Sequence, residues 1–170
     1  MGTVSLRRPD GSSQASVPSG IVASFMDTQE LASSGTYTLK VDPSNAATGT
    51  TTLTVYDVPA DTQGTVTVGG SAVAVSPGTP RQNGTLTFSG TASQTVTVRM
   101  TSNTIGTGGI RGITTVRLLK PDGSELGTVS SNASSFNMAS KTLPVAGTYT
   151  IVVNPSGTDT GSINVQVTNP

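Results

Sequence analysis

The segment GTYTIVVNPSGTDTGSINVQV at residues 147–167 decides the fold, because a close copy of it, GTYTLKVDPSNAATGTTTLTV, occupies residues 35–55. In the later copy Tyr149, Ile151 and Val153 fall on every second position. This period of two is typical of a β-strand that has one face in a core. The earlier copy keeps the same spacing, so both segments are predicted to contain core strands.

The period of two recurs along the rest of the chain, and no segment keeps a period of 3.6 over the roughly 11 residues that would indicate a helix. Helix is therefore expected to be negligible. The fold class is predicted to be all-β, built from immunoglobulin-like or jelly-roll-like β-sandwich modules. The residues expected to face inward are Tyr37, Leu39, Val41, Val96, Val98, Met100, Tyr149, Ile151, Val153, Val116, Leu118, Ile163, Val165 and Val167.

The repetition extends well beyond the two quoted segments. An offset of 112 residues pairs Thr3 with Thr115 and the PDGS at 9–12 with the PDGS at 121–124. Residues 1–58 and 113–170 are thus two copies of one sequence, which we call the back half, whereas residues 62–107, the front half, have no second copy. We predict one and a half repeat units: a complete sandwich at 62–170 and an incomplete half-unit at 1–58.

Turn-forming residues separate the predicted strands. In each PDGS, Pro presets φ, Asp can bond the backbone two residues on, and Gly accepts the remaining dihedrals. The sequence TVTVGGSAVAV predicts a hairpin with Gly69 and Gly70 in a tight turn. Asp42-Pro43 and Asn154-Pro155 are expected to end their strands, because proline donates no ladder hydrogen bond.

Composition argues against catalysis. The chain has no Cys and no His, which removes thiolate chemistry, the usual base for a Ser nucleophile and the commonest transition-metal ligand. The acidic residues stand mostly singly in turns, and a weak surface cation site at Asp122 and Glu125 is the less favoured interpretation. We predict no enzyme activity, no catalytic or metal-binding residue and no cofactor.

Charge and aromatic content also limit the partners. The formal net charge is +0 and the basic residues are scattered, so no nucleic-acid surface is expected. No apolar run is long enough to span a membrane, so no membrane insertion is expected. Of the few aromatic residues only Tyr56 is out of phase with its apolar neighbours, which is too few exposed rings for a sugar-binding platform.

Three segments carry a family resemblance: FSGTASQTVTVRM (88–100), TTVRLLKPDGSELGTV (114–129) and LPVAGTYTIVVNPSGTDTGSINVQV (143–167). Their order resembles the bacterial pre-peptidase C-terminal domain. The chain is also similar to tandem β-sandwich repeats of very large secreted bacterial proteins, including those with Rhs or YD repeats, in which LTVYDVPADTQGTVTVGG (53–70) is a typical junction. Members of that family often carry a pair of aspartates just before the strand that leads to PDG, and some of these pairs suggest a calcium site. In this chain that place reads TGGIRGITTVRLL (107–119) and has no aspartate pair.

The resemblance implies an extracellular or cell-surface module that is not itself catalytic. We predict a structural element of a bacterial surface protein or fibre that self-assembles into a filament by strand complementation between subunits. Its expected partners are copies of itself or neighbouring repeats of a tandem array. The alternative is a carbohydrate- or protein-binding appendage of a secreted protein.

Three arrangements would supply strands to the half-unit at 1–58. The chain could be an excerpt of a longer array whose neighbouring unit provides them. A second copy of the chain could add its strands, and such a heterologous contact would propagate into an open filament. Alternatively, the front half could lend strands to both back halves of one chain.

Overall fold

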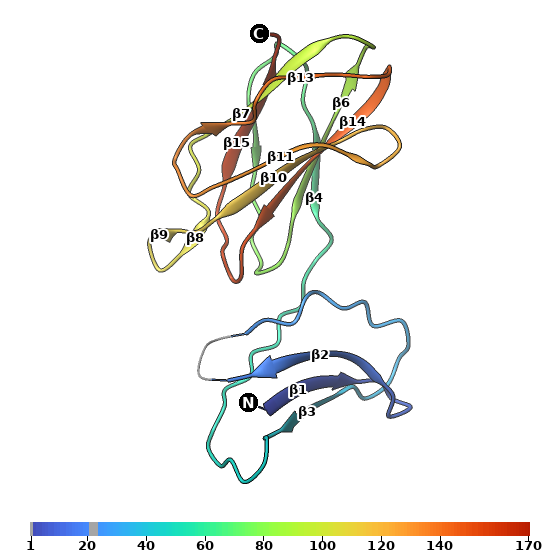
Figure 1. Cartoon of the computed structure of the whole chain (residues 1–170), viewed down its shortest axis with the longest axis vertical. Coiled ribbons are helices and arrows are strands. Elements are labelled where there is room, and N and C mark those ends of the chain that lie inside the picture. The colour runs from blue at the N-terminus through green and yellow to red at the C-terminus, as the bar shows by residue number, and fades with distance from the viewer. Residues whose placement is uncertain (1, 21–23) are drawn as a thin grey trace. The chain divides into compact units, whose positions relative to one another are not determined.

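The computed structural model describes residues 2–20 and 24–170 (Figure 1). The regular structure in these residues consists of strands, and none of them belongs to a helix of the length and hydropathy needed to cross a bilayer. The chain divides into two compact units, Met1–Val55 and Tyr56–Pro170. The sequence had suggested parts at 1–58 and 62–170.

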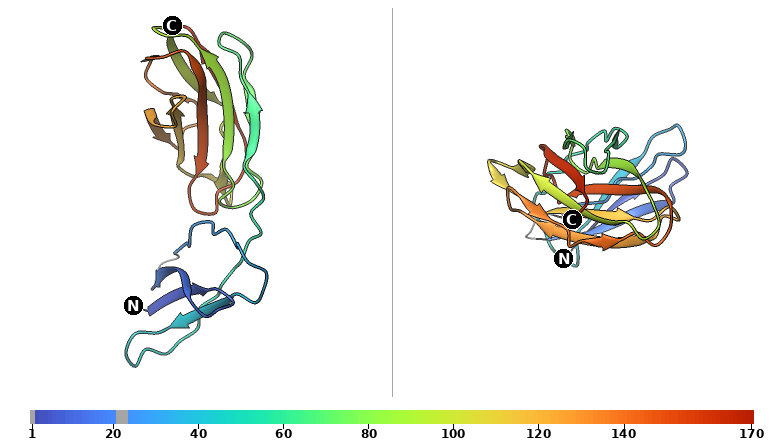
Figure 2. Two further views of the ribbon diagram at one scale, coloured as in Figure 1. Left: turned by 90° about the vertical axis from the view of Figure 1, so that its right-hand side faces the viewer. Right: turned by 90° about the horizontal axis from the view of Figure 1, so that it is seen from above.

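The C-terminal unit is a sandwich of two sheets, seen from two further directions in Figure 2. One five-stranded sheet has the order β11-β10-β14-β6-β4, and the other has the order β12-β7-β15-β5 with β13 also pairing with β7. A two-stranded ribbon, β8-β9, stands beside them. The strands are β4 (Thr62–Thr65), β5 (Val73–Val75), β6 (Gly84–Gly90), β7 (Thr95–Thr101), β8 (Gly106–Thr107), β9 (Ile110–Arg111), β10 (Thr114–Leu119), β11 (Glu125–Ser131), β12 (Phe136–Asn137), β13 (Lys141–Thr142), β14 (Gly147–Pro155) and β15 (Ile163–Thr168).

The core of this unit lies between the two sheets and is formed by alternate residues of their strands. The predicted inward positions of β7, β10, β14 and β15 are all buried, with exposed fractions of at most 1%. The rings of Phe88 and Tyr149 stack across β6 and β14 with centroids 5.5 Å apart. The predicted all-β sandwich is therefore confirmed for residues 56–170.

Each sheet of this unit contains strands of both halves of the repeat. β6 of the front half pairs antiparallel with β14, and β4 adds to β6 in parallel. In the other sheet β15 of the back half lies between β7 and β5 of the front half. In the described residues the strands β5, β6 and β7 of the front half thus pair with strands of the second back half, and β4 pairs with β6.

The N-terminal unit has a single three-stranded sheet among the described residues, of order β2-β1-β3. Its strands are β1 (Gly2–Arg7), β2 (Ser13–Ser19) and β3 (Thr38–Asp42). Val4 lies opposite Val41 in β1 and β3, just as Val116 lies opposite Val153 in β10 and β14. The bulge after Leu6 also recurs after Leu118. The repeat is therefore a structural repeat in register for three strands.

Both PDGS turns form as predicted. The Gly11 amide donates to the Arg8 carbonyl oxygen and the Gly123 amide to the Lys120 carbonyl oxygen, each at 2.9 Å. Gly11 and Gly123 have φ of 83° and 81°, in the left-handed region that glycine occupies without steric cost. Identical local sequence has therefore given identical turns, in the complete unit and in the half-unit alike.

Two other turn predictions need correction. The predicted hairpin at Gly69-Gly70 does not form: β4 and β5 lie in different sheets, and the Gly69 amide donates to Val167 at the end of β15. Sheet partners elsewhere in the sequence outweighed the local hairpin pattern. β3 ends at Asp42 as predicted, but β14 continues to Pro155, which still pairs with Thr114 after the ladder with β6 has ended at Val153.

Candidate functional site

Of the two residues considered for a cation site, Asp122 serves a turn, and Glu125 is the exposed first residue of β11. Asp122 Oδ1 accepts hydrogen bonds from the Ser124 hydroxyl at 2.6 Å and from the Ser124 amide at 2.9 Å. The hydrogen bond from the Ser124 side chain is the main cause that lowers the pKa of Asp122, and Ser12 lowers the pKa of Asp10 in the same way. These carboxylates stabilise the turns in their charged form.

No ligand set for a metal ion occurs in the described ranges 2–20 and 24–170, where no three acidic side chains converge. At the place where the resembling family carries paired aspartates, Asp159 Oδ1 accepts one hydrogen bond from the Thr107 hydroxyl at 2.9 Å. That carboxylate fixes the β8-β9 ribbon to the loop before β15.

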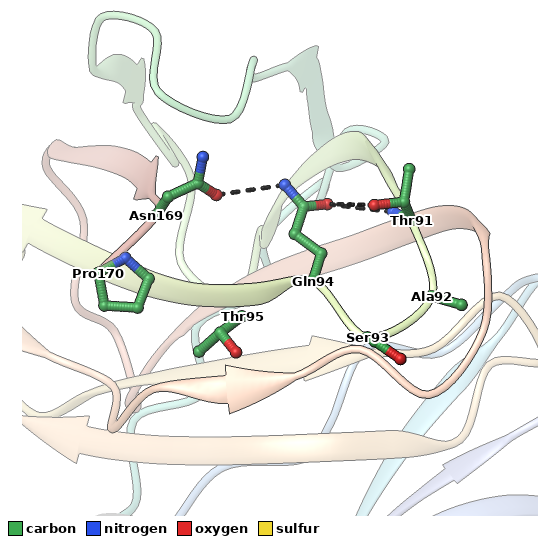
Figure 3. Close-up of a pocket in the computed structure, with 7 residues that line it drawn as sticks. All are labelled: Thr91, Ala92, Ser93, Gln94, Thr95, Asn169 and Pro170. Carbon is green, nitrogen blue, oxygen red and sulfur yellow. Dashed lines mark hydrogen bonds between the residues drawn. The ribbon is translucent and has the colours of Figure 1, made fainter.

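A polar hollow of about 480 Å³ lies at the turn between β6 and β7 (Figure 3). Gln94 organises it: its Oε1 accepts from the Thr91 amide at 3.0 Å, and its Nε2 donates to Asn169 Oδ1 at 3.2 Å. Ser93 at the tip has φ of 65°. Both the oxygen and the nitrogen of the Gln94 side-chain amide are hydrogen-bonded within the protein. The hollow is therefore best explained as the surface of the turn that joins the two sheets, and not as a ligand site.

The N-terminal unit exposes several apolar side chains that are buried at the equivalent positions of the C-terminal unit, although Val4 of β1, opposite Val41, is buried. Every residue of β3 is exposed, including Leu39 and Val41, which were expected to face a core. Leu31 is 56% exposed whereas its equivalent Leu143 is 0% exposed, and Val55 is 76% exposed whereas Val167 is 0% exposed. We call this group of exposed apolar side chains the open face; its residues are Leu39 and Val41 of β3, and Phe25, Leu31, Leu53 and Val55 of the irregular segments before and after it.

The open face has an open strand edge beside it. In the C-terminal unit β14 pairs with β10 on one side and with β6 on the other. Among the described residues β3 pairs with β1 alone, so the edge that β6 covers in the complete unit carries no strand. An unpaired edge next to exposed apolar side chains is a template for the addition of another strand.

The segments that would form the second sheet of the half-unit are irregular. Residues 24–37 and 43–61 contain no strand, although the equivalents of 24–25, 29–30 and 51–56 form β12, β13 and β15 in the C-terminal unit. Those three strands pair with β5 and β7 of the front half. The half-unit keeps the strands that pair within it and lacks those whose partners are in the front half.

The start of β3 nevertheless keeps the geometry of the complete unit. The Tyr37 hydroxyl donates to the Ser33 carbonyl oxygen at 3.1 Å, and the Tyr149 hydroxyl donates to the Val145 carbonyl oxygen at 2.8 Å. This is a tyrosine corner, which fixes the approach to a strand in β-sandwiches. The tyrosine corner before β3 thus forms without the second sheet, although residues 35–37, the equivalents of 147–149 in β14, are not in a strand.

Comparison with known proteins gives structural similarities only. No family model matches the chain, and no curated protein sequence matches it. The chain is similar in structure to the pre-peptidase C-terminal domain of a collagenase from Bacillus anthracis, with 12% identity, a TM-score of 0.46, and coverage of 65% of this chain and 99% of that one. The family named from the sequence motifs is therefore also found among the structural neighbours.

Two further solved structures are similar over the same share of the chain. A periplasmic inhibitor of g-type lysozyme from Aeromonas hydrophila has 21% identity and a TM-score of 0.40, with coverage of 64% of this chain and 99% of that one. A β-glucosidase from Paenibacillus barengoltzii has 13% identity and a TM-score of 0.32, with coverage of 64% of this chain and 12% of that one.

Proposed function

We propose that the protein is a structural linking module of an extracellular bacterial surface protein or fibre, joined to its neighbours by strand complementation of the N-terminal unit. The observation that carries this proposal is the open face together with the unpaired edge of β3. Exposed apolar side chains favour association, because burying each removes apolar area from water. The motif resemblance to secreted bacterial repeats supports the extracellular location.

Association between copies of the chain would give the filament form of this function. In such a contact the open face of one copy receives an edge strand from a different surface of a second copy. The contact is therefore heterologous, and repeating it adds further copies to an open filament. The free edges of the C-terminal unit, such as β4 and β11, are available for such a contact.

Light scattering after size exclusion, at rising concentrations of the full chain, tests the filament form. The proposal expects oligomers that grow with concentration and extended particles in negative stain. A monomer of 17.0 kDa at all concentrations would contradict self-assembly and would favour the alternative, a protein-binding appendage.

A further inference from the structure

We propose that the specific occupant of the open face is an unpaired front half from a neighbouring repeat of the same kind: an extended segment with the residue pattern of β6 and β7. This inference rests on the proposed linking function and names the partner's chemistry. The molecule itself supplies the template, because the second back half of the same chain is seen with its front half in place.

The pairing of β6 with β14 defines what the first strand of such a segment must carry. Ile151 lies opposite Leu86, Tyr149 opposite Phe88, and Gly147 opposite Gly90. Transferred by the repeat offset, a donor needs an aliphatic residue opposite Leu39 and an aromatic residue opposite Tyr37. Phe88 stacks on Tyr149 in the complete unit, so Tyr37 offers the same ring surface.

A glycine is the third requirement. A side chain on Gly90 would collide with Leu143 and would approach the Tyr149 ring to 3.1 Å. Leu31 and Tyr37 are the equivalent residues of the half-unit, and they would fill the same space once the face is closed. The donor therefore needs the pattern aliphatic, polar, aromatic, polar, glycine, which β6 has in the sequence LTFSG at 86–90.

The second strand of the donor would order the irregular segments. In the complete unit β7 lies between β15 and the short strands β12 and β13. The equivalents of β15 and of those short strands lie at residues 51–56, 24–25 and 29–30, which are not in strands. A segment like β7 would supply the partner that these residues lack, and Leu53 and Val55 would become buried as Val165 and Val167 are.

The chain just before the acceptor edge already has the backbone geometry of the complete unit. Gly35 has φ of 144°, and a Cβ atom placed on it would lie 2.7 Å from Cγ of the Pro9 ring. Gly147 has φ of 152°, and a Cβ atom placed on it would lie 2.7 Å from Cγ of the Pro121 ring. A preformed acceptor loses less conformational entropy on binding, which favours affinity. The cost that remains is the ordering of residues 24–30 and 51–56.

A folded copy of this chain is not the source of the front half. Each chain has one front half and two back halves, and that front half is already paired with β14 and β15. A copy that donated it would open an equal apolar face on its own C-terminal unit. Exchange between copies therefore leaves the exposed area unchanged and provides no driving force.

The test adds a synthetic peptide of residues 84–101 to the full chain and measures binding by calorimetry and by amide hydrogen exchange. We expect saturable 1:1 binding, slowed exchange at residues 35–42 and 51–56, and unchanged exchange at 147–155. Any oligomers formed by the chain alone should dissociate as the peptide saturates them. Slowed exchange elsewhere in the chain with none at 35–42 would overturn the inference.

Variants on both sides make the test specific. The peptide with Gly90→Val or Phe88→Ala should bind at least about 10-fold more weakly, a loss of about 1.4 kcal/mol or more. These changes leave the protein untouched, so folding of the chain cannot explain them. In the chain, Val41→Asp on the open face should abolish binding, whereas Thr38→Asp on the opposite face of β3 should not. Equal binding of all peptides would overturn the proposed pattern.

The outcomes separate this inference from the proposed function. Oligomers that neither bind the peptide nor dissociate in its presence would overturn the inference and would still support self-assembly. A monomer that binds the peptide in the expected register would support the inference and remove the filament form. A monomer that binds no peptide would overturn both.

Discussion

The two back halves have nearly the same sequence pattern, yet only one of them is a folded half of a sandwich. In the first back half β1, β2 and β3 pair in the same register as β10, β11 and β14 do in the second. They differ where the front half is needed: β12, β13 and β15 have no counterpart strands among the described residues of the N-terminal unit. Strand formation in this repeat thus depends on the presence of a partner strand as well as on the local pattern.

The difference also separates local from tertiary contributions to stability. Turns and the tyrosine corner form in both halves, since their hydrogen bonds are between residues close in sequence. Complete burial at this strand position needs the second sheet: Ile151 is 0% exposed and its equivalent Leu39 is 36% exposed, although Val4 of β1 is buried in the half-unit as well. The apolar alternation of a strand is necessary for a core, but a facing sheet completes it.

The largest expected effect is a contrast between two matched substitutions. Ile151→Ala removes a fully buried side chain and should lower the unfolding free energy of the C-terminal unit by about 2–5 kcal/mol. Leu39→Ala removes a side chain already in contact with water and should cost less than about 1 kcal/mol. Urea unfolding followed through amide signals assigned to each unit measures both.

The result that would break the comparison is an equal cost at both positions. It would mean that Leu39 is buried in solution by a second sheet or by another molecule. The measurement should therefore be made at a dilution at which the chain does not associate.

A smaller effect is expected at the turns, where the two halves should respond alike. The pKa of Asp122 and that of Asp10 are both lowered from 3.8, so each carboxylate contributes stability above that pH and loses the contribution as pH falls through its lower folded value. Asp122→Asn should therefore slightly lower the melting temperature at about pH 7, and this effect should shrink as the pH falls below 3.8.

Asp10→Asn serves as the matched variant in the half-unit, with exchange of the Ser12 amide as its measure. The Ser12 amide donates to Asp10 Oδ1 at 2.8 Å, as the Ser124 amide does to Asp122 at 2.9 Å. A loss of amide protection at one turn and not at the other would contradict the view that these turns form independently of the second sheet.

The fold class could be predicted because the period of two and the PDGS turns depend on residues close in sequence. The 112-residue offset can be found by comparing the sequence with itself. Sequence reasoning also predicted that the half-unit would be incomplete, from one front half against two back halves. It wrongly expected Leu39 and Val41 to lie in a core, and it wrongly read Gly69-Gly70 as a hairpin. Both errors concern which strands meet across the sandwich, which depends on partners far away in the sequence.

The sequence could also not give the shape of the open face. Tyr37, Leu39 and Val41 alternate as core residues do, yet Leu39 and Val41 are exposed and Tyr37 is half-buried, because the described residues form no second sheet over β3. The signal available beforehand was the count of halves, which indicates that a face is uncovered but does not indicate how much of it stays ordered.

Hydrogen exchange of the unassociated chain tests most directly whether a back half needs a front half to form its second sheet. Residues 163–168 of β15 should exchange only on global unfolding of the C-terminal unit, whereas the equivalent residues 51–56 should exchange at nearly the rate of an unstructured peptide. Strong protection of residues 51–56 in the monomer would contradict this, because it would mean that the half-unit builds its second sheet alone.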